Sequence, residues 1–246
     1  MYKHKKENIM RSTKAIINLS NLRHNINQIK ANLSPETKIC CAVKADCYGH
    51  GAVECAKVLL EEGVQYLAIA TVEEGIELRE NEINAPLIML SLCNFDEISD
   101  AVKNDITPFV FDKEYIDAFN AECKKQNKKN YSVHLAVDSG MGRIGCYKEE
   151  TAELASYINS TECLTLGGMS THFSVSDCAD SNSEKYTSEQ LNYFLEAIDN
   201  VKKAGINPGI RHCANSAAAM LIKKAELDMV RPGIILYGYY AGDLTA

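Results

Sequence analysis

The sequence of 246 residues contains no tryptophan, and its five prolines and fourteen glycines are too few to form a low-complexity linker. No apolar run reaches the roughly 18 to 20 residues that a membrane span requires, and the N-terminus lacks the apolar segment of a secretory signal. A positive surface for nucleic acid is also missing, because the net charge is −7. These absences predict a cytoplasmic protein that binds neither membranes nor nucleic acid.

Paired cysteine spacing is absent too, because the ten cysteines include no C-x-x-C motif. Metal sites and disulfide frameworks both need such pairs, so we expect free thiols in a reducing compartment and no metal site. The hydrophobic fraction of 46% is that of a folded globular protein. Residues 1–12 are expected to form a polar tail, and residues 13–246 a single folded domain.

Strand-like and helix-like segments alternate along the chain. The strand-like segments are residues 39–43, 66–70, 87–90, 107–111, 133–137, 164–170, 209–212 and 227–230. The amphipathic helical segments are residues 52–62, 72–81, 95–103, 113–125, 149–159, 184–204 and 214–223. Eight such units in roughly 200 residues predict an α/β fold, a closed (β/α)8 TIM-type barrel, with an open doubly wound sheet as the alternative.

Two segments fit this pattern less well. Pro108 is awkward inside the fourth strand, because proline cannot donate to a sheet. Ahead of the barrel, residues 13–19 are expected to form a strand and Ser20 to cap a helix over residues 21–32. This unit could be a lid on the bottom of the barrel or a piece of a second domain.

The first candidate for chemistry is Lys44, which directly follows the first strand and precedes Tyr48, Gly49 and Gly51. Active sites of such barrels lie at the C-terminal ends of the strands. Partial burial there lowers the pKa of a lysine and frees its amine as a nucleophile. The glycine-rich turn offers backbone N–H groups to an anion. A surface lysine beside an ordinary turn is the alternative interpretation.

The loop after the eighth strand contains Arg231 and Gly233. A glycine lets the backbone approach a phosphate closely, and loops after strands seven and eight often bind phosphate in these barrels. Arg231 is expected at the barrel mouth beside it. An ordinary turn with the sequence Arg-Pro-Gly is the alternative.

Strands six and seven also end in polar residues. Asn215 and Ser216 follow the seventh strand and are candidates both for the helix cap and for the site. His172 follows the sixth strand and is expected at the mouth, where a structural, hydrogen-bonded histidine is the alternative to a catalytic one.

Strand alternation in the fifth strand places His134, Ala136 and Asp138 on one face, which we assign to the barrel interior, with residues 133, 135 and 137 on the other. The glycine-rich loop that follows contains Arg143, whose planar guanidinium suits a substrate carboxylate. A solvated loop arginine is the alternative. Together, a lysine nucleophile, a phosphate site and a carboxylate site are what a pyridoxal-phosphate enzyme acting on amino acids requires.

At these positions the sequence resembles the alanine racemase family of fold type III pyridoxal-phosphate enzymes. Residues 43–51 look like the lysine motif of the family, residues 134–145 resemble its Gly-Met-Gly-Arg segment, and residues 229–238 its Arg-Pro-Gly segment. The resemblance implies interconversion of the L- and D-enantiomers of alanine, or of serine, for D-amino acid biosynthesis and the supply of peptidoglycan precursors. For the full-length family member it also implies a homodimer.

The resemblance assigns roles to individual residues. Lys44 would hold the cofactor covalently and transfer one α-proton. The phosphate would be held by Tyr48, Ser216, Gly233, Ile234 and neighbouring backbone, and Asn215 would also belong to the cofactor-binding residues.

Four further residues would surround the cofactor ring or the substrate. Arg231 would donate to the pyridine nitrogen, and His212 would support that arginine. His172 would lie near the ring. Arg143 would meet the phenolic oxygen of the cofactor or the substrate carboxylate.

Two departures from the family pattern stand out. Many members have a lysine, often carbamylated, where this sequence has Ala136, so Arg143 lacks that partner. The family also has a C-terminal β-domain with a tyrosine that serves as second base across a head-to-tail dimer, and we expect that domain to be absent here, because the sequence stops at Ala246.

Two other functions remain open at this stage. A single-barrel, non-catalytic pyridoxal-phosphate-binding protein of the homeostasis type fits the length better, but its lysine motif lacks the Tyr-Gly-His-Gly continuation of residues 48–51. A decarboxylase of the same fold type would also need a second β-domain.

Overall fold

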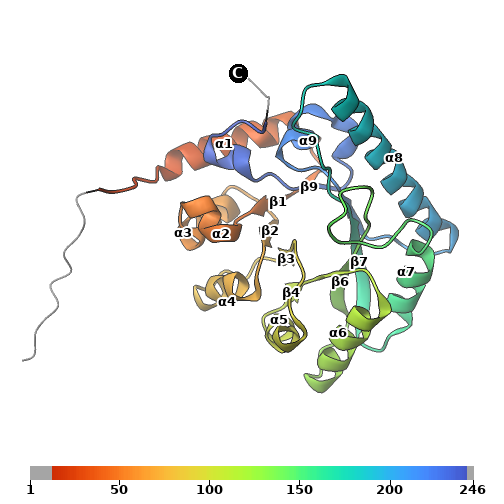
Figure 1. Ribbon diagram of the computed structural model, residues 1–246. Coiled ribbons are helices and arrows are strands. Elements are labelled where there is room, and N and C mark those ends of the chain that lie inside the picture. Colours follow the sequence, from red (N-terminus) through yellow and green to blue (C-terminus); the bar gives the residue numbers. More distant parts are fainter. Residues whose placement is uncertain (1–12, 243–246) are drawn as a thin grey trace, which may run out of the picture.

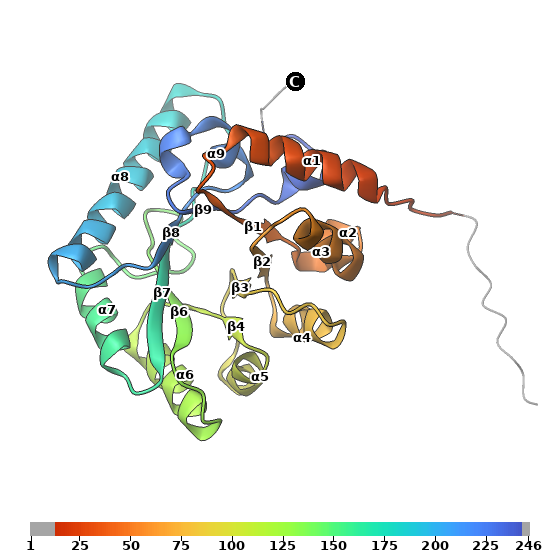
Figure 2. The ribbon, with the colours of Figure 1, turned by 180° about the vertical axis from the view of Figure 1, so that it is seen from behind.

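A ring of short parallel strands surrounded by helices makes up the computed structural model, which describes residues 13–242 (Figures 1 and 2). The strands are β1 (Lys38–Ala42), β2 (Tyr66–Ile69), β3 (Leu87–Met89), β4 (Ile106–Thr107), β5 (Phe109–Val110), β6 (Tyr131–Ala136), β7 (Leu164–Ser170), β8 (Ile210–His212) and β9 (Met229–Val230). Every pairing between them is parallel, as helical crossovers require. The predicted (β/α)8 barrel is confirmed, and the open doubly wound sheet is wrong.

The helices follow the strands in alternation. They are α1 (Leu19–Asn32), α2 (Lys44–Gly49), α3 (Ala52–Glu61), α4 (Val72–Glu80), η1 (Phe95–Glu97), α5 (Ile98–Lys103), α6 (Lys113–Lys125), α7 (Thr151–Ser160), α8 (Ser181–Lys203), α9 (Ser216–Leu221), η2 (Lys223–Ala225) and η3 (Ile234–Tyr237). The last predicted helix, 214–223, is shorter than expected, because the chain leaves helical geometry at Ile222. No helix in the described part of the chain is long and apolar enough to cross a membrane.

The barrel consists of two hydrogen-bonded sheets, in the orders β4-β3-β2-β1-β9 and β5-β6-β7-β8. Pro108 separates β4 from β5, so the fourth predicted strand is divided between the sheets instead of being continuous. Proline has no N–H to donate, but its carbonyl accepts the N–H of His134 at 3.0 Å. On the opposite side the N–H of Asp228 donates to the carbonyl of Arg211 at 3.1 Å, and this second seam, between β8 and β9, closes the ring.

Side chains of the strands form an inner and an outer core. The inner core is built from Cys40, Ala42, Ala68, Ile88, Phe109, Ala136 and Met229. Residues of β6 with the opposite parity, Val133 and Leu135, belong to the larger core between the strands and the helices. Ala136 therefore faces the barrel interior, as strand alternation predicted.

The segment before β1 differs from the prediction. Residues 13–18 form no strand, and Ile16 is 88% exposed. Helix α1 begins at Leu19 and is capped by Asn18, whose side chain accepts the N–H groups of Ser20 and Asn21, so Ser20 is not the cap. Residues 1–12, the predicted tail, lie outside the described residues.

Helix α1 is neither a lid on the bottom of the barrel nor part of another domain. It packs against α3 and η3 and occupies the gap in the ring of helices between α9 and α3 (Figure 1). Up to residue 242, where the described part of the chain stops, the one helical element after β9 is the short η3, and α1 occupies the place of a longer helix in the eighth unit.

Candidate active site

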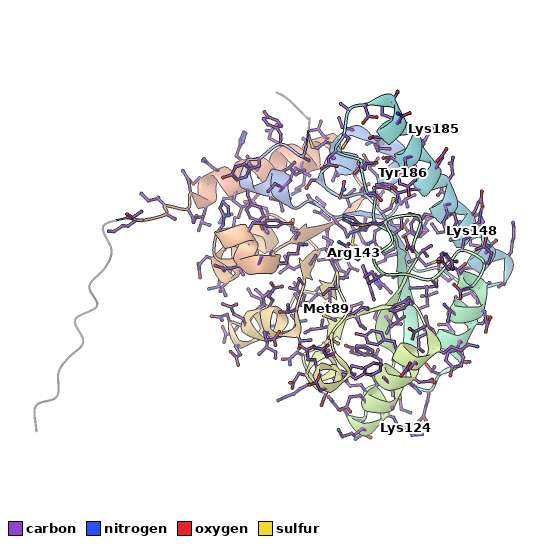
Figure 3. The ribbon with its side chains drawn as sticks, in the orientation of Figure 1. Met89, Lys124, Arg143, Lys148, Lys185 and Tyr186 are labelled. Carbon is purple, nitrogen blue, oxygen red and sulfur yellow. The ribbon has the colours of Figure 1, made fainter. Side chains whose placement is uncertain are left out.

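A cavity of about 340 Å³ opens at the C-terminal ends of the strands. Its polar and charged lining residues include Lys44, Asp138, Arg143, Thr171, His172 and Arg231. Figure 3 shows Arg143 inside the ring of helices, on the segment after β6, whereas Lys124 and Lys185 lie on its outer rim. The cavity thus brings together four of the residues singled out from the sequence, from four different strand ends.

Lys44 stands at the start of an unusual turn. The next four residues, from Ala45 to Tyr48, have φ between 50° and 55° and form a left-handed helical turn, although none is glycine. This conformation costs L-residues roughly 1–2 kcal/mol each, so the surrounding structure must hold it in place. Such strain next to a lysine in a cavity wall is typical of a functional site.

Glu74, in the first turn of α4, is one of the groups that hold this turn. Its Oε1 accepts the N–H of Ala45 at 2.6 Å, and its Oε2 accepts the N–H of Ala70 at 2.6 Å. The same carboxylate closes the capping box of α4 with Thr71. Glu74 therefore connects the turn after Lys44 to the end of β2.

The charge state of Lys44 follows from its surroundings. Partial burial lowers the pKa of Lys44, nearby Arg143 lowers it further, and Glu74 opposes both. A lowered pKa increases the fraction of neutral amine, which is the nucleophilic form.

Arg231 is the most deeply buried cation of the cavity, with 5% of its surface exposed. Its Nη1 donates to Nδ1 of His212 at 2.7 Å and its Nη2 donates to the carbonyl of Thr171 at 2.8 Å. Among the described residues no carboxylate pairs with it, and its buried Nε–H has no acceptor. A buried donor without a partner is costly, so this Nε–H is suited to an acceptor from a ligand.

The histidines around Arg231 are neutral bases of low strength. Burial, and then the charge of Arg231, lowers the pKa of His172 to about 3 and that of His212 well below its usual value. His172 lines the cavity and accepts from Nη2 of Arg231 at 3.2 Å. His212 is fully buried behind the arginine and does not line the cavity.

The predicted phosphate residues lie close to one another. The N–H of Gly233 donates to Oγ of Ser216 at 2.9 Å. A Cβ added to Gly233 would lie 2.9 Å from Oη of Tyr48, so any larger residue would require the tyrosine side chain to shift. Asn215 is the helix cap of α9, through its Oδ1 and the N–H of Ala218, which leaves the hydroxyl of Ser216 for the loop after β9. Asn215, Ser216 and Ile234 line a second cavity of about 310 Å³.

The loop after β6 is stabilised by hydrogen bonds to one of its own side chains. Oδ1 of Asp138 accepts the N–H groups of Gly140 and Gly142 at 2.9 and 3.0 Å. Arg143 has no hydrogen-bond or ion-pair partner in the described part of the chain, and the methyl of Ala136 occupies the wall near it. With Lys44, Arg143 and Arg231 against Asp138, the cavity is suited to an anionic ligand.

Two residues of this arrangement were missed in the sequence. Glu74 could have been found from its capping-box spacing to Thr71, although that pattern does not predict its contact with Ala45. His134 was placed on the inner face without a role, yet its ring lies against His212.

The comparisons with known proteins agree with this geometry. Residues 17–241 match the family described as "Alanine racemase, N-terminal domain". An alanine racemase of Treponema denticola is 50% identical over 94% of this chain and 60% of its own length, and one of Desulfovibrio desulfuricans is 44% identical over 93% and 61%. The chain thus spans about 60% of the length of these curated relatives.

Solved structures show the same similarity. The alanine racemase of Clostridium difficile 630 in complex with cycloserine superimposes with a TM-score of 0.89 at 43% identity, over 92% of this chain and 62% of that one. The alanine racemase of Bacillus anthracis with bound L-Ala-P gives a TM-score of 0.83 at 32% identity, over 91% and 57%.

Proposed function

Because this chain belongs to the alanine racemase family, we propose that it forms the cofactor-binding barrel of a pyridoxal-phosphate-dependent racemase. The reaction is the interconversion of L- and D-alanine, with serine as the second substrate to test. The observation that supports this most directly is the cavity lined both by Lys44 and by a buried Arg231 that has no carboxylate partner among the described residues.

The residues present fit pyridoxal phosphate in three respects. The unpartnered Nε–H of Arg231 offers a donor to the pyridine nitrogen, which is an acceptor. Gly233 leaves space beside Tyr48 and Ser216 for phosphate oxygens. Lys44 supplies an amine of lowered pKa for covalent attachment.

Lys44 has two tasks in this proposal. Its Nζ would hold the cofactor covalently and, as a free amine, would remove or return the α-proton on one face of the substrate. When bound, pyridoxal phosphate withdraws electrons from the α-carbon and makes its hydrogen acidic. The left-handed turn after Lys44, fixed by Glu74, keeps the amine at the cavity wall.

Arg231 and Arg143 orient the reactants. Arg231 is too basic to give up its proton, so it would donate a hydrogen bond to the pyridine nitrogen without protonating it, and this would limit electron withdrawal and disfavour transamination. The guanidinium of Arg143 is unpaired in the described structure and is free to bind the substrate carboxylate in a bidentate manner. His172 fixes Nη2 of Arg231 from the cavity side.

We further propose a cytoplasmic location and a homodimer. All ten cysteines are free thiols, nine of them buried, which fits a reducing compartment. The homodimer rests on the family alone.

The test combines labelling with proton exchange. The protein is incubated with pyridoxal phosphate, reduced with borohydride, digested and mapped by mass spectrometry, and the cofactor mass is expected on Lys44. In a second sample that is not reduced, NMR in D₂O should show loss of the α-proton of alanine. A cofactor mass mapped to another lysine, or no exchange by the unreduced protein when the reduced sample is labelled at Lys44, would contradict the proposal.

A further inference from the structure

A line of three buried side chains runs from the cavity into the barrel interior. Nη1 of Arg231 lies 2.7 Å from Nδ1 of His212, and Nε2 of His212 lies 2.9 Å from Nδ1 of His134. All three are at most 5% exposed. The line joins β9 to β8 and β6, although His134 and His212 are 78 residues apart in sequence.

The donor inventory fixes the direction of both hydrogen bonds. A guanidinium only donates, so Nδ1 of His212 accepts from Arg231. A neutral imidazole has one donor and one acceptor, so Nε2 of His212 carries the proton and donates to Nδ1 of His134. His134 must then hold its own proton on Nε2. No other assignment satisfies the two contacts.

Both rings are uncharged. Burial, followed by the charge of Arg231, lowers the pKa of His134 to about 3, and the same two causes lower the pKa of His212 well below its usual value. They therefore orient Arg231 without neutralising it, whereas a carboxylate in the same place would pair with its charge. The full positive charge of Arg231 stays available to a ligand.

The strand next to His134 has a glycine beside the imidazole ring, and its pairing with β6 is irregular at this position. A Cβ added to Gly168 in β7 would lie 2.5 Å from the carbonyl oxygen of Ile210 and 2.8 Å from Cε1 of His134. The register between β6 and β7 shifts between Val133 and His134. Phe109 stacks on the other side of the ring, with centroids 6.5 Å apart. The position is thus shaped for an imidazole in the inner core.

From this geometry we propose that His134 is a positioning residue of the site. By accepting the Nε2–H of His212 it holds His212 in one tautomer, and His212 in turn fixes the orientation in which Arg231 presents its Nε–H to the cavity. The consequence for the cofactor rests on the proposed function, but the hydrogen-bond arrangement itself does not.

The first experiment needs no cofactor. In the 246-residue protein labelled with ¹⁵N-histidine, nitrogen chemical shifts report which ring nitrogen carries the proton. We expect His212 and His134 both as Nε2–H tautomers at neutral pH. A His212 protonated on Nδ1, or on both nitrogens, would overturn the proposal whatever the protein binds.

Two substitutions then separate positioning from packing. His134→Asn keeps an acceptor near the place of Nδ1, and His134→Phe keeps a planar ring without one. We expect the Phe variant to lose the single-tautomer signal of His212 and to bind pyridoxal phosphate about tenfold more weakly, which corresponds to about 1.4 kcal/mol. The Asn variant should keep that signal and bind within about threefold of wild type.

The matched control is His24→Asn, which changes a histidine on α1 outside the site, and it should alter neither readout. Equal loss of affinity in the Asn and Phe variants, with the His212 signal unchanged in both, would mean that His134 only packs the core. The expected tautomers in a protein that does not bind the cofactor would leave the positioning of Arg231 standing and contradict the proposed function instead.

Discussion

Glu74 holds Ala45, the first residue after Lys44, through a hydrogen bond of 2.6 Å from the backbone N–H to its Oε1. The carboxylate belongs to α4, so the left-handed turn depends on a helix that begins 28 residues further along the chain. Because Glu74 on a separate helix stabilises the strained turn, the backbone next to Lys44 can keep this conformation although Ala45 is not a glycine.

Glu74→Ala should therefore weaken cofactor binding, although Glu74 lies on α4 and not on the turn that contains Lys44. Removing the acceptor leaves the N–H groups of Ala45 and Ala70 unpaired, and a hydrogen bond to a charged group contributes roughly 1.5–3 kcal/mol. We expect covalent binding of pyridoxal phosphate, followed by absorbance, to weaken at least tenfold. The control is Glu73→Ala, which changes the exposed neighbouring residue. Equal cofactor binding by the two variants would show that Glu74 does not hold the turn after Lys44.

Lys44→Ala should abolish the visible absorbance band that a lysine-bound cofactor produces, while leaving the thermal unfolding temperature within a few degrees of wild type. Lys38→Ala removes a lysine at the opposite end of the same strand and should keep the band. If the protein with an intact Lys44 stays colourless at saturating cofactor, the assignment of Lys44 is wrong.

Arg231→Glu should change the chemistry of the cofactor rather than only its affinity. A carboxyl group can share a proton with the pyridine nitrogen, so the ring becomes a stronger electron acceptor. We expect more transamination, measured as pyruvate formed from alanine. Arg231→Lys, which keeps the charge but loses Nε, should not raise pyruvate; unchanged side reactions in the Glu variant would show that Arg231 does not face the ring nitrogen.

The described cavity offers one strong base. Besides Lys44, the nearest candidates are His172, whose pKa is lowered to about 3 by burial and Arg231, and Tyr48, whose pKa is raised by burial. Racemisation needs a base on each face of the α-carbon, and such groups contribute about 10²- to 10⁴-fold. We expect residues 1–246 alone to form D-alanine at least about 100-fold more slowly than a chimera that continues, after Gly238, with the remaining part of the Treponema denticola relative. Comparable rates would require a second base within the barrel.

Stability should fall in mild acid because of the buried histidines. The unfolded chain binds a proton at each histidine below pH of about 6.5, but the folded protein keeps His134 neutral down to a pKa of about 3. Each such residue therefore lowers the free energy of unfolding by about 1.4 kcal/mol per pH unit between these values. Urea unfolding of wild type and His134→Asn at several pH values should give a shallower dependence for the variant. Parallel curves would mean that His134 titrates normally.

The strands were predictable because buried, β-rich segments of this length recur between amphipathic helices. Strand β7 has the predicted bounds, Leu164–Ser170, and helix α6 the predicted Lys113–Lys125. Residues 13–19 have the same local pattern but form no strand, because no strand edge is left for them to pair with. The edge of β1 that faces away from β2 is already paired with β9. Local pattern alone does not distinguish these cases.

The site was predictable only as far as strand ends reveal it. Lys44, Arg143, His172 and Arg231 each follow a strand, so the barrel fold was enough to bring them together. The left-handed turn was not foreseen, because Ala45 and its neighbours contain no glycine and the turn depends on Glu74. The contact of His134 with His212 spans 78 residues and depends on the register of three strands.

The division of the barrel into two sheets has a consequence for how ligand and fold depend on each other. Lys44 and Arg231 follow strands of one sheet, whereas His172 follows and His212 ends a strand of the other, so the hydrogen bond from Arg231 to His212 crosses the seam between β8 and β9. A ligand that contacts both sheets stabilises the closed seam. At a concentration of 100 times its Kd, it raises the free energy of opening the seam by about 2.7 kcal/mol. The N–H groups of Asp228 and Arg231 donate across the seam, so their hydrogen exchange with solvent should become slower when the ligand is bound. The exchange rates of these two amides would then report how much of the site is occupied.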